Sequence, residues 1–339
     1  MVRLKDIAAR AGVSVMTVSK VMRDAKDISA ATKARIGALA REMGYVPDRA
    51  AQGLRSRQSK LFGLLMSAAT NPIFARILMA LEEQAFEMGY EMIFAHSLNQ
   101  MEREEAMIRR LMSRRVDGLF IYPVYRMNPS APVYQDLKRS GIPTVILGHT
   151  APFCADFANV ETDDLAASQE ITRHLISLGH RRIAFFTGPQ IVPWSQERLA
   201  GYRNALQEAQ IPDDDRLIYS AGPTVEEGAK AALQFLDERC DATAIQTVND
   251  LVAIGAASTL LDQGIKIPQD ISVTGFGNIL VSEHFRVPLT TVRQPKFRLG
   301  IAAMESMKKL LAGQTPLRQR LPAEIVVRRS SGPPRSTVA

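Results

Sequence analysis

The chain has 339 residues, enough for two or three domains, and 46% of them are hydrophobic, which is ample for packed cores. No run of about 18 uncharged apolar residues is present, and charged residues follow the first methionine, so we expect neither a membrane span nor a secretory signal. The two cysteines, Cys154 and Cys240, lack metal-ligand spacing and fit a reducing cytoplasm.

The positive charge is concentrated in one part of the chain. Residues 1–60 contain 13 Lys and Arg but only 5 Asp and Glu, whereas residues 61–339 contain 29 and 30. The first segment therefore carries a formal charge of +8 and the remainder −1. A small basic segment attached to a nearly neutral body is typical of a module that binds the phosphates of a nucleic acid.

Two short helices are predicted within residues 3–23, RLKDIAARAGVSVMTVSKVMR. Apolar residues recur every three or four positions on either side of a break at residues 11–14. At the break, Gly12 can end the first helix with a positive φ, and the Ser14 hydroxyl can cap the second. A third helix is expected from Ser29 to Gly44. The pattern predicts a helix-turn-helix headpiece over residues 1–46, whose second helix can lie in the major groove of DNA.

The rest of the chain follows a different pattern. Residues 47–60 are basic and contain almost no core-forming side chains, so we predict a hinge or linker there. Short apolar runs then alternate with amphipathic helices, and several helices end at a glycine just before the next run. These runs are residues 61–66, 90–95, 118–123, 143–147, 182–187, 242–248, 271–276 and 324–328. This order predicts βαβ units, and hence parallel sheet covered by helices on both faces.

The body is too long for one ordinary doubly wound sheet, so we predict two lobes. The chain would cross between them near residues 160–163 and return near residues 290–293. The predicted fold class is therefore α/β, with a helix-turn-helix headpiece, a two-lobed body and a ligand cleft at the carboxyl ends of the strands. We assign residues 61–161 and 293–323 to an N-terminal lobe, residues 162–292 and 324–331 to a C-terminal lobe, and residues 332–339 to a flexible tail.

Five segments carry a family resemblance. They are LKDIAARAGVSVMTVSKV at the start, YVPDRAAQGLRS in the linker, RLAGY at 198–202, VND at 248–250 and PLTTVRQPKFRLG at 288–300. In this order and spacing the chain resembles the lactose-repressor/galactose-repressor (LacI/GalR) family of bacterial transcriptional regulators. The resemblance implies a body like that of periplasmic sugar-binding proteins, an operator-binding repressor, and control by a small molecule in the cleft. The tail SSGPPRSTVA lacks the apolar heptads of a tetramerising helix, which favours a homodimer on a near-palindromic operator.

The resemblance assigns base reading to Val15, Met16 and Lys20. Two apolar side chains can contact a thymine methyl group but cannot form bidentate hydrogen bonds, so polar readout would fall mainly to Lys20. Helix packing of Val15 and simple solvation of Lys20 are the alternatives. The other candidate DNA contacts are Ser14, Thr17, Ser19, Arg23, Arg49, Leu54 and Arg55; the hydroxyl groups would hold phosphates, and Leu54 would wedge between base pairs in the minor groove.

The resemblance also suggests ligand contacts in the cleft. Arg198 matches an arginine that binds sugar hydroxyls or a purine acceptor, Asn249 matches a polar contact, and Phe74 matches an aromatic wall. The remaining candidates are Asn71, Asp163, Asn278 and Trp194, the last being the only tryptophan of the chain. The chain departs from the family at Gly277, where many members have an aspartate, and at Pro223, where an aromatic residue is usual.

Trp194, Arg198 and Asn249 together favour a carbohydrate, because sugars stack on aromatic rings and need paired donors and acceptors for their hydroxyls. A nucleobase or phosphorylated effector, or an interface role for Trp194, are the alternatives. A solute-binding module without DNA function and an α/β enzyme are the other classes. No metal-ligand spacing, phosphate-binding loop or nucleophile elbow is found, so we expect no catalysis and no cofactor.

Overall fold

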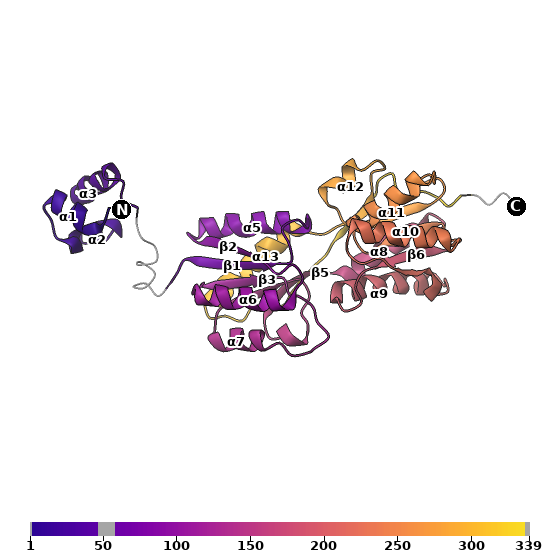
Figure 1. Ribbon diagram of the computed structural model, residues 1–339, viewed down its shortest axis with the longest axis horizontal. Coiled ribbons are helices and arrows are strands. Elements are labelled where there is room, and N and C mark those ends of the chain that lie inside the picture. The colour runs from indigo at the N-terminus through magenta and orange to yellow at the C-terminus, as the bar shows by residue number, and fades with distance from the viewer. Residues whose placement is uncertain (1, 47–57, 336–339) are drawn as a thin grey trace. The chain divides into compact units, whose positions relative to one another are not determined.

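The computed structural model describes residues 2–46 and 58–335. They belong to two compact units, which divide between Ser59 and Lys60. The smaller unit is helical, and the larger unit contains two sheets with helices on their faces (Figure 1). None of the helices within the described ranges is long and apolar enough to cross a membrane.

The helical unit contains α1 (Leu4–Ala11), α2 (Val15–Met22) and α3 (Ala30–Glu42). Helix α1 ends at Gly12, whose φ of 67° is unfavourable for residues with a side chain. The Ser14 hydroxyl accepts a hydrogen bond of 3.0 Å from the Thr17 N–H and so caps α2. The core is formed by Ile7, Ala8, Ala11, Val18, Val21, Ile36 and Ala40. The predicted helix-turn-helix and its third helix are confirmed.

The first lobe of the body contains a six-stranded parallel sheet in the order β11-β5-β4-β3-β1-β2. Its strands are β1 (Leu61–Met66), β2 (Glu91–His96), β3 (Gly118–Ile121), β4 (Thr144–Leu147), β5 (Ala158–Thr162) and β11 (Gln319–Leu321). Helices α5 (Ile73–Glu87) and α13 (Lys296–Leu311) cover one face, and α6 (Met101–Ser113) and α7 (Pro132–Ser140) cover the other. The sheet therefore has a separate apolar core on each side.

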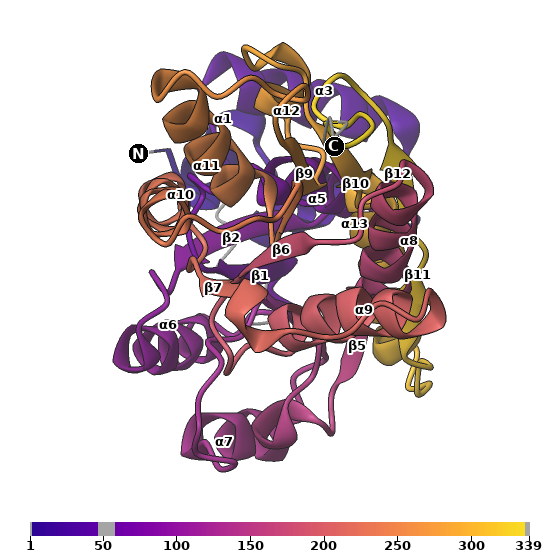
Figure 2. The same ribbon diagram turned by 90° about the vertical axis from the view of Figure 1, so that its right-hand side faces the viewer.

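The second lobe contains a six-stranded sheet in the order β12-β10-β9-β8-β6-β7. Its strands are β6 (Ile183–Thr187), β7 (Ile218–Ser220), β8 (Ala244–Thr247), β9 (Ser272–Gly277), β10 (Thr290–Arg293) and β12 (Glu324–Val326). All pairs are parallel except β10 with β12. Helices α10 (Val225–Asp237) and α11 (Asp250–Asp262) cover one face, and α8 (Asp164–Ser177) and α9 (Pro193–Glu208) cover the other (Figure 2). The short helix α12 (Leu280–His284) follows β9.

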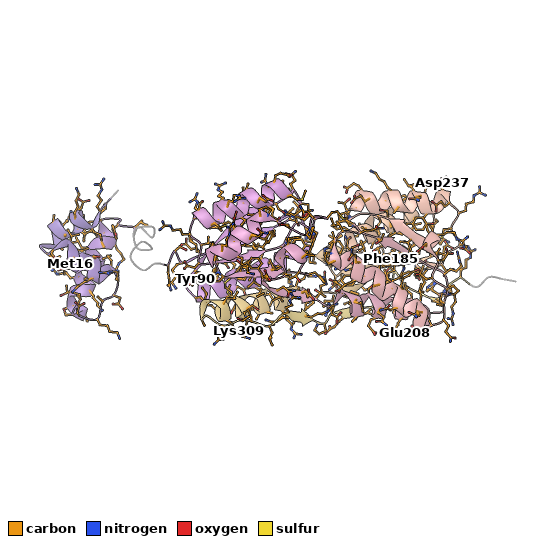
Figure 3. The ribbon with its side chains drawn as sticks, turned by 90° about the horizontal axis from the view of Figure 1, so that it is seen from below. Met16, Tyr90, Phe185, Glu208, Asp237 and Lys309 are labelled. Atoms are coloured by element: carbon orange, nitrogen blue, oxygen red, sulfur yellow. The ribbon has the colours of Figure 1, made fainter. Side chains whose placement is uncertain are left out.

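Side-chain placement in the second lobe follows from this layering. Phe185 in β6 is fully buried between the helices, whereas Glu208 and Asp237 are exposed at the ends of α9 and α10 (Figure 3). The predicted α/β body with helices on both faces of each sheet is thus confirmed.

The chain passes between the lobes three times: from β5 to α8, from β10 to α13, and from β11 to β12. The predicted lobe boundaries were 161/162, 292/293 and 323/324. In the structure, β5 continues to Thr162 in the first sheet, and β10 continues to Arg293 in the second.

Two features of the body differ from the sequence predictions. Strands β5, β10 and β11 are short and largely polar, and β7 has only three residues, so none of the four is among the predicted apolar runs. Their pairing with neighbouring strands, rather than their own hydrophobicity, defines them. The second difference is in the predicted flexible tail, residues 332–339. Its first residue, Gly332, is buried and donates its N–H to Ser272 Oγ at 3.0 Å, so the tail is attached to the second lobe at this point. Residues 336–339 lie outside the described ranges.

Candidate functional site

Helix α2 presents the side chains that were expected to read DNA bases. Met16 is 68% exposed and Val15 is 46% exposed, whereas Val18 on the same helix is fully buried. Val15 and Met16 therefore face solvent instead of completing the core. The Lys20 ammonium pairs with the Asp27 carboxylate, so in this structure the lysine is held at the helix surface by an acidic neighbour.

The remaining headpiece candidates lie near the same helix. The hydroxyls of Ser14 and Thr17 are 2.9 Å apart at its first turn, and Arg23 donates from Nε to the Ser19 carbonyl at 3.1 Å. These groups surround the exposed end and side of α2. The predicted contacts at Arg49, Leu54 and Arg55 lie outside the described residues.

The body contains a cavity of about 130 Å³ where the carboxyl ends of both sets of strands meet. Every lining segment follows or ends a strand, as expected for ligand sites in parallel α/β folds. The first lobe contributes Asn71, Phe74, Tyr122, His149 and Glu161, among others. The second lobe contributes Asp164, Trp194, Arg198, Pro223, Asn249, Asp250 and Phe276, and Gln294 follows β10. The structure thus brings together five of the predicted ligand residues: Asn71, Phe74, Trp194, Arg198 and Asn249.

Arg198 is the central basic side chain of the cavity. Its Nε and Nη2 donate to Asp164 Oδ1 at 3.0 and 2.7 Å, and its Nη1 donates to the Val248 carbonyl at 2.6 Å. The guanidinium lies 3.7 Å from the ring centre of Phe276 and 4.8 Å from that of Trp194. It is therefore fixed by charge, hydrogen bonds and stacking before any ligand binds.

A direct hydrogen bond joins the two lobes at the cavity wall. Trp194 Nε1, from α9, donates to the Tyr122 hydroxyl at 2.9 Å, and Tyr122 in turn makes an edge contact with Phe74. Burial raises the pKa of Tyr122 to about 12, so its hydroxyl stays protonated and retains one hydrogen for another acceptor. The contact places three aromatic rings along one side of the cavity.

The loop that carries Tyr122 is anchored by a buried carboxylate. Glu104 Oε1 accepts hydrogen bonds from the Val124 N–H at 2.6 Å and from the Tyr134 hydroxyl at 2.8 Å. Its other oxygen pairs with Arg126. This set of bonds fixes the chain directly after β3 and therefore the position of the Tyr122 ring.

Asn249 caps helix α11, with Oδ1 accepting from the Val252 N–H at 2.8 Å and Nδ2 donating to the Pro223 carbonyl at 3.0 Å. Asp250, the next residue, accepts from the Ile279 N–H and the Ser282 hydroxyl at 2.9 and 2.7 Å. This buried carboxylate lies beside the glycine-rich end of β9. A Cβ atom on Gly275 would lie 2.2 Å from Asp250 Oδ1, so the glycine makes room for it.

Two predicted ligand residues do not line the cavity. Asp163 caps α8 through the Ala166 N–H at 3.1 Å and pairs with Arg320 at 3.0 Å. Asn278 Oδ1 accepts from Arg328 Nη2 at 2.9 Å. Asp163 is thus used as a helix cap and in a pair with the first lobe, and Asn278 is used within the second lobe. The carboxylate that faces Arg198 belongs to Asp164, one residue further along the chain.

Sequence reasoning missed His149, Asp164, Glu161 and Tyr122. His149 is not among the ligand residues predicted from the sequence. Its Nε2 lies 3.1 Å from Glu197 Oε2 and 3.7 Å from Asp164 Oδ2, across the boundary between the lobes. Position in the chain could have indicated His149, which comes two residues after the predicted strand at 143–147. Tyr122 lies inside the predicted run 118–123, but the observed strand β3 ends one residue before it.

Charge pairs connect the lobes beside the cavity. Arg320, in β11, pairs with Glu161 of its own lobe and with Asp163 and Glu197 of the other. Burial opposes the charged form of Glu197, but the adjacent His149 and Arg320 outweigh it and lower its pKa to about 2. Burial likewise opposes protonation of His149, but Glu197, Asp164 and Glu161 raise its pKa above the usual value. Both groups are therefore charged in mildly acidic solution.

The described residues hold no cluster of three or more His, Cys, Asp or Glu side chains suited to a metal ion. The cavity's groups are arranged to donate, accept and stack, which is the chemistry of binding. A basic helix-turn-helix unit followed by a two-lobed ligand-binding body defines a class: regulators of transcription that respond to a small molecule.

Comparison with known proteins agrees with this class. Residues 3–48 match the family model "Bacterial regulatory proteins, lacI family", and residues 172–331 match the "Periplasmic binding protein-like domain". The ribose operon repressor of Escherichia coli (strain K12) is 32% identical over 321 residues, covering 95% of this chain and 96% of the relative. The HTH-type transcriptional repressor PurR of Photobacterium profundum is 31% identical, covering 97% and 98%.

Solved structures give the same result. The lac repressor dimer bound to operator and the anti-inducer ONPF is similar with a TM-score of 0.87 and 27% identity, covering 98% of this chain and 99% of that one. A LacI family regulator from Enterococcus faecium with bound ribose has a TM-score of 0.71 and 26% identity, covering 80% and 99%. The chain belongs to the lacI family of bacterial regulatory proteins, and it is a DNA-binding transcriptional regulator.

Proposed function

We propose that this protein is a repressor that binds a near-palindromic operator as a homodimer, and that a carbohydrate in the interlobe cavity controls this binding. Support for the DNA part comes from the exposed Val15 and Met16 on α2 and from the similarity to an operator-bound lac repressor dimer. A regulator that acts on operator DNA works in the cytoplasm, where we place this chain.

The observation that carries the effector assignment is the combination of aromatic and polar groups in one wall. Phe74, Tyr122 and Trp194 supply ring faces and edges for the apolar C–H surface of a sugar. Asp164 and Arg198 supply fixed acceptors and donors for adjacent hydroxyls. The relatives are consistent with this choice, since they include a ribose operon repressor and a ribose-bound regulator.

A purine-type effector is the second candidate, and the aromatic side of the cavity is the observation that favours it. A planar base can stack on the same rings, and two relatives are the repressors PurR and CytR. The polar groups distinguish the candidates. A sugar uses Asp164 and Arg198 on neighbouring hydroxyls, whereas a base has few donors arranged in that way.

The effector assignment is tested by thermal shift of the full-length protein against separate panels of sugars and of purine bases and nucleosides. Binding to the native state stabilises it by an amount that grows with the logarithm of the free ligand concentration above Kd, so a hit appears as a dose-dependent increase in melting temperature. We expect hits among the sugars. Stabilisation by the purine panel alone would overturn the assignment.

A pair of arginine variants locates the binding site. Arg198→Lys keeps one positive charge but loses the planar fork, so the sugar-dependent increase should disappear. Arg216→Lys is the matched control, because Arg216 is 86% exposed and pairs only with surface Asp214 among the described contacts. A sugar response that survives Arg198→Lys unchanged would place the ligand elsewhere.

DNA binding is tested by selecting duplexes from a random pool with the full-length protein. We expect recovered sites with two inverted half-sites, and release or strengthening of the complex when the stabilising sugar is added. Recovery of no preferred sequence, with or without sugar, would refute the regulator mechanism for this chain.

A further inference from the structure

The charged side chains that line the cavity are mostly acidic. Glu161, Asp164 and Asp250 each contribute a carboxylate, whereas Arg198 and His149 are the basic residues among the described lining residues. Asp164 and Asp250 are almost completely buried. Carboxylates therefore outnumber basic groups, three to two, among the charged side chains that a ligand meets in this space.

The arginine of the cavity is already neutralised. Two of the nitrogen atoms of Arg198 donate to one oxygen of Asp164, and the third donates to the Val248 carbonyl. A phosphate or carboxylate is normally held by an arginine that offers both fork nitrogens to it. Arg198 can still donate a remaining N–H to a hydroxyl, but its charge is paired with Asp164, and two of its nitrogen atoms already donate to that carboxylate.

The other nearby cations are also paired. His149 faces Glu197 and Asp164, and Arg320 pairs with Glu197. Lys296, next to the cavity, donates to the carbonyl of Asn278 at 2.9 Å and to that of Gly277. His149, Arg320 and Lys296 thus each have an acidic or carbonyl partner.

Helix N-termini are the second common device for binding anions, and those of α5, α8 and α11 at the cavity are occupied. Asp163 caps α8, Asn249 caps α11, and Asn71 accepts the Ile73 N–H at the start of α5. Two of these helices also have an aspartate, Asp164 or Asp250, as the first residue. The positive ends of their dipoles therefore already face carboxylates.

We propose that the cavity discriminates by charge: it accepts an uncharged polyhydroxylated ligand and excludes the phosphorylated or carboxylated form of the same molecule. The inference rests on the proposed effector site and makes its ligand class narrower. The acceptors that exclude an anion are useful for a polyol, because Asp164 and Glu161 can accept hydrogen bonds from hydroxyl groups. The same carboxylates thus provide both affinity and selectivity.

The test compares matched ligand pairs on the full-length protein by calorimetry: ribose with ribose 5-phosphate, glucose with glucose 6-phosphate, and adenosine with adenosine monophosphate. We expect the charged member of a binding pair to be weaker by on the order of 100-fold, the effect of one like charge a few ångströms away in a partly shielded site. A charged member that binds as tightly as its neutral partner, or more tightly, overturns the inference.

The purine pair separates the two proposals. If adenosine binds, the sugars do not and the nucleotide is rejected, the sugar assignment fails while the charge rule stands. If adenosine binds, the sugars do not and the nucleotide binds with the same affinity as adenosine, the sugar assignment and the charge rule both fail.

Inorganic phosphate at millimolar concentration provides a second test, which does not require the ligand of the cavity to be known. The single tryptophan, Trp194, lies in the cavity wall, so its fluorescence would report an anion bound there. Because we expect the cavity to exclude phosphate, the fluorescence should not change, and a saturable change overturns the inference.

Charge variants identify the origin of the discrimination. Glu161→Gln removes one carboxylate from the lining, keeps its size, and should narrow the gap between neutral and phosphorylated ligands about tenfold. Glu170→Gln is the matched control, since Glu170 is exposed on α8 and pairs with Arg173 away from the lining residues. An unchanged gap in Glu161→Gln, or an equal narrowing in the control, would show that the cavity carboxylates do not set the selectivity.

Discussion

Substitution of Glu197 by glutamine should weaken the connection between the lobes in a pH-dependent way. Glu197 Oε1 and Oε2 accept from Arg320 at 3.0 and 2.5 Å, and Oε2 also lies 3.1 Å from His149. Its pKa of about 2, against an ordinary value of 4.5, corresponds to at most about 3 kcal/mol of stabilisation. The side chain is 23% exposed and solvent screens the pairs, so we expect a loss of about 1–2 kcal/mol in Glu197→Gln at pH 6.

The sign of the pH dependence follows from the lowered pKa. The folded protein holds the Glu197 proton less tightly than the unfolded chain does, so the stabilisation is complete above about pH 4.5 and is lost as the pH falls toward 2. At pH 4 about half of the expected 1–2 kcal/mol difference between wild type and Glu197→Gln should have disappeared. Urea unfolding of both proteins at pH 6 and pH 4, followed by tryptophan fluorescence, measures this difference.

A variant on the same helix serves as the control. Glu208 is half exposed and pairs with Arg173 within the second lobe, so Glu208→Gln should change stability by less than about 0.5 kcal/mol at either pH. The reasoning is refuted if Glu197→Gln is as stable as wild type at pH 6, or if its deficit stays constant down to pH 4.

Three further predictions concern other parts of the molecule. Tyr122→Phe should leave the Trp194 N–H without its acceptor, cost about 1–2 kcal/mol in urea unfolding and change the tryptophan emission; an unaltered spectrum would contradict the interlobe bond. Gly255→Ala would place a Cβ 1.9 Å from a backbone oxygen of α10 and should lower stability by at least about 2 kcal/mol, whereas Gly37→Ala, with 3.7 Å of room in α3, should be neutral or stabilising. Lys20→Ala should relax sequence preference at one operator base pair, and a selection experiment that returns the wild-type site would disprove its reading role.

The headpiece could be predicted almost completely from the sequence, because its information is local. Apolar spacing defines the helices, Gly12 is the turn residue, and the Ser14 hydroxyl forms the expected cap. The apolar strands of the body could be found for the same reason. The short polar strands could not, since a segment such as 319–321 becomes a strand only by pairing with β5, more than 150 residues earlier in the chain.

The cavity shows where sequence reasoning stops. Phe74, Trp194 and Arg198 were found because they lie in recognisable segments after predicted strands. The charge network was missed, because His149 and Glu197 meet only when the two lobes face each other. The sequence prediction chose Asp163 as a ligand residue, but the structure places Asp164 in the cavity wall. At the start of α8, Asp163 accepts a hydrogen bond from the Ala166 N–H, whereas Asp164 accepts one from Arg198.

The threefold passage of the chain between the lobes has a consequence for synthesis on the ribosome. Residues 324–332 complete the second sheet: β12 pairs with β10, and the Ser330 and Gly332 carbonyls accept hydrogen bonds from Val273 and His180. The headpiece, by contrast, needs only its own residues for its core. A nascent chain can therefore display a finished helix-turn-helix while both lobes are still incomplete, and its DNA-binding end matures before the part that senses the ligand.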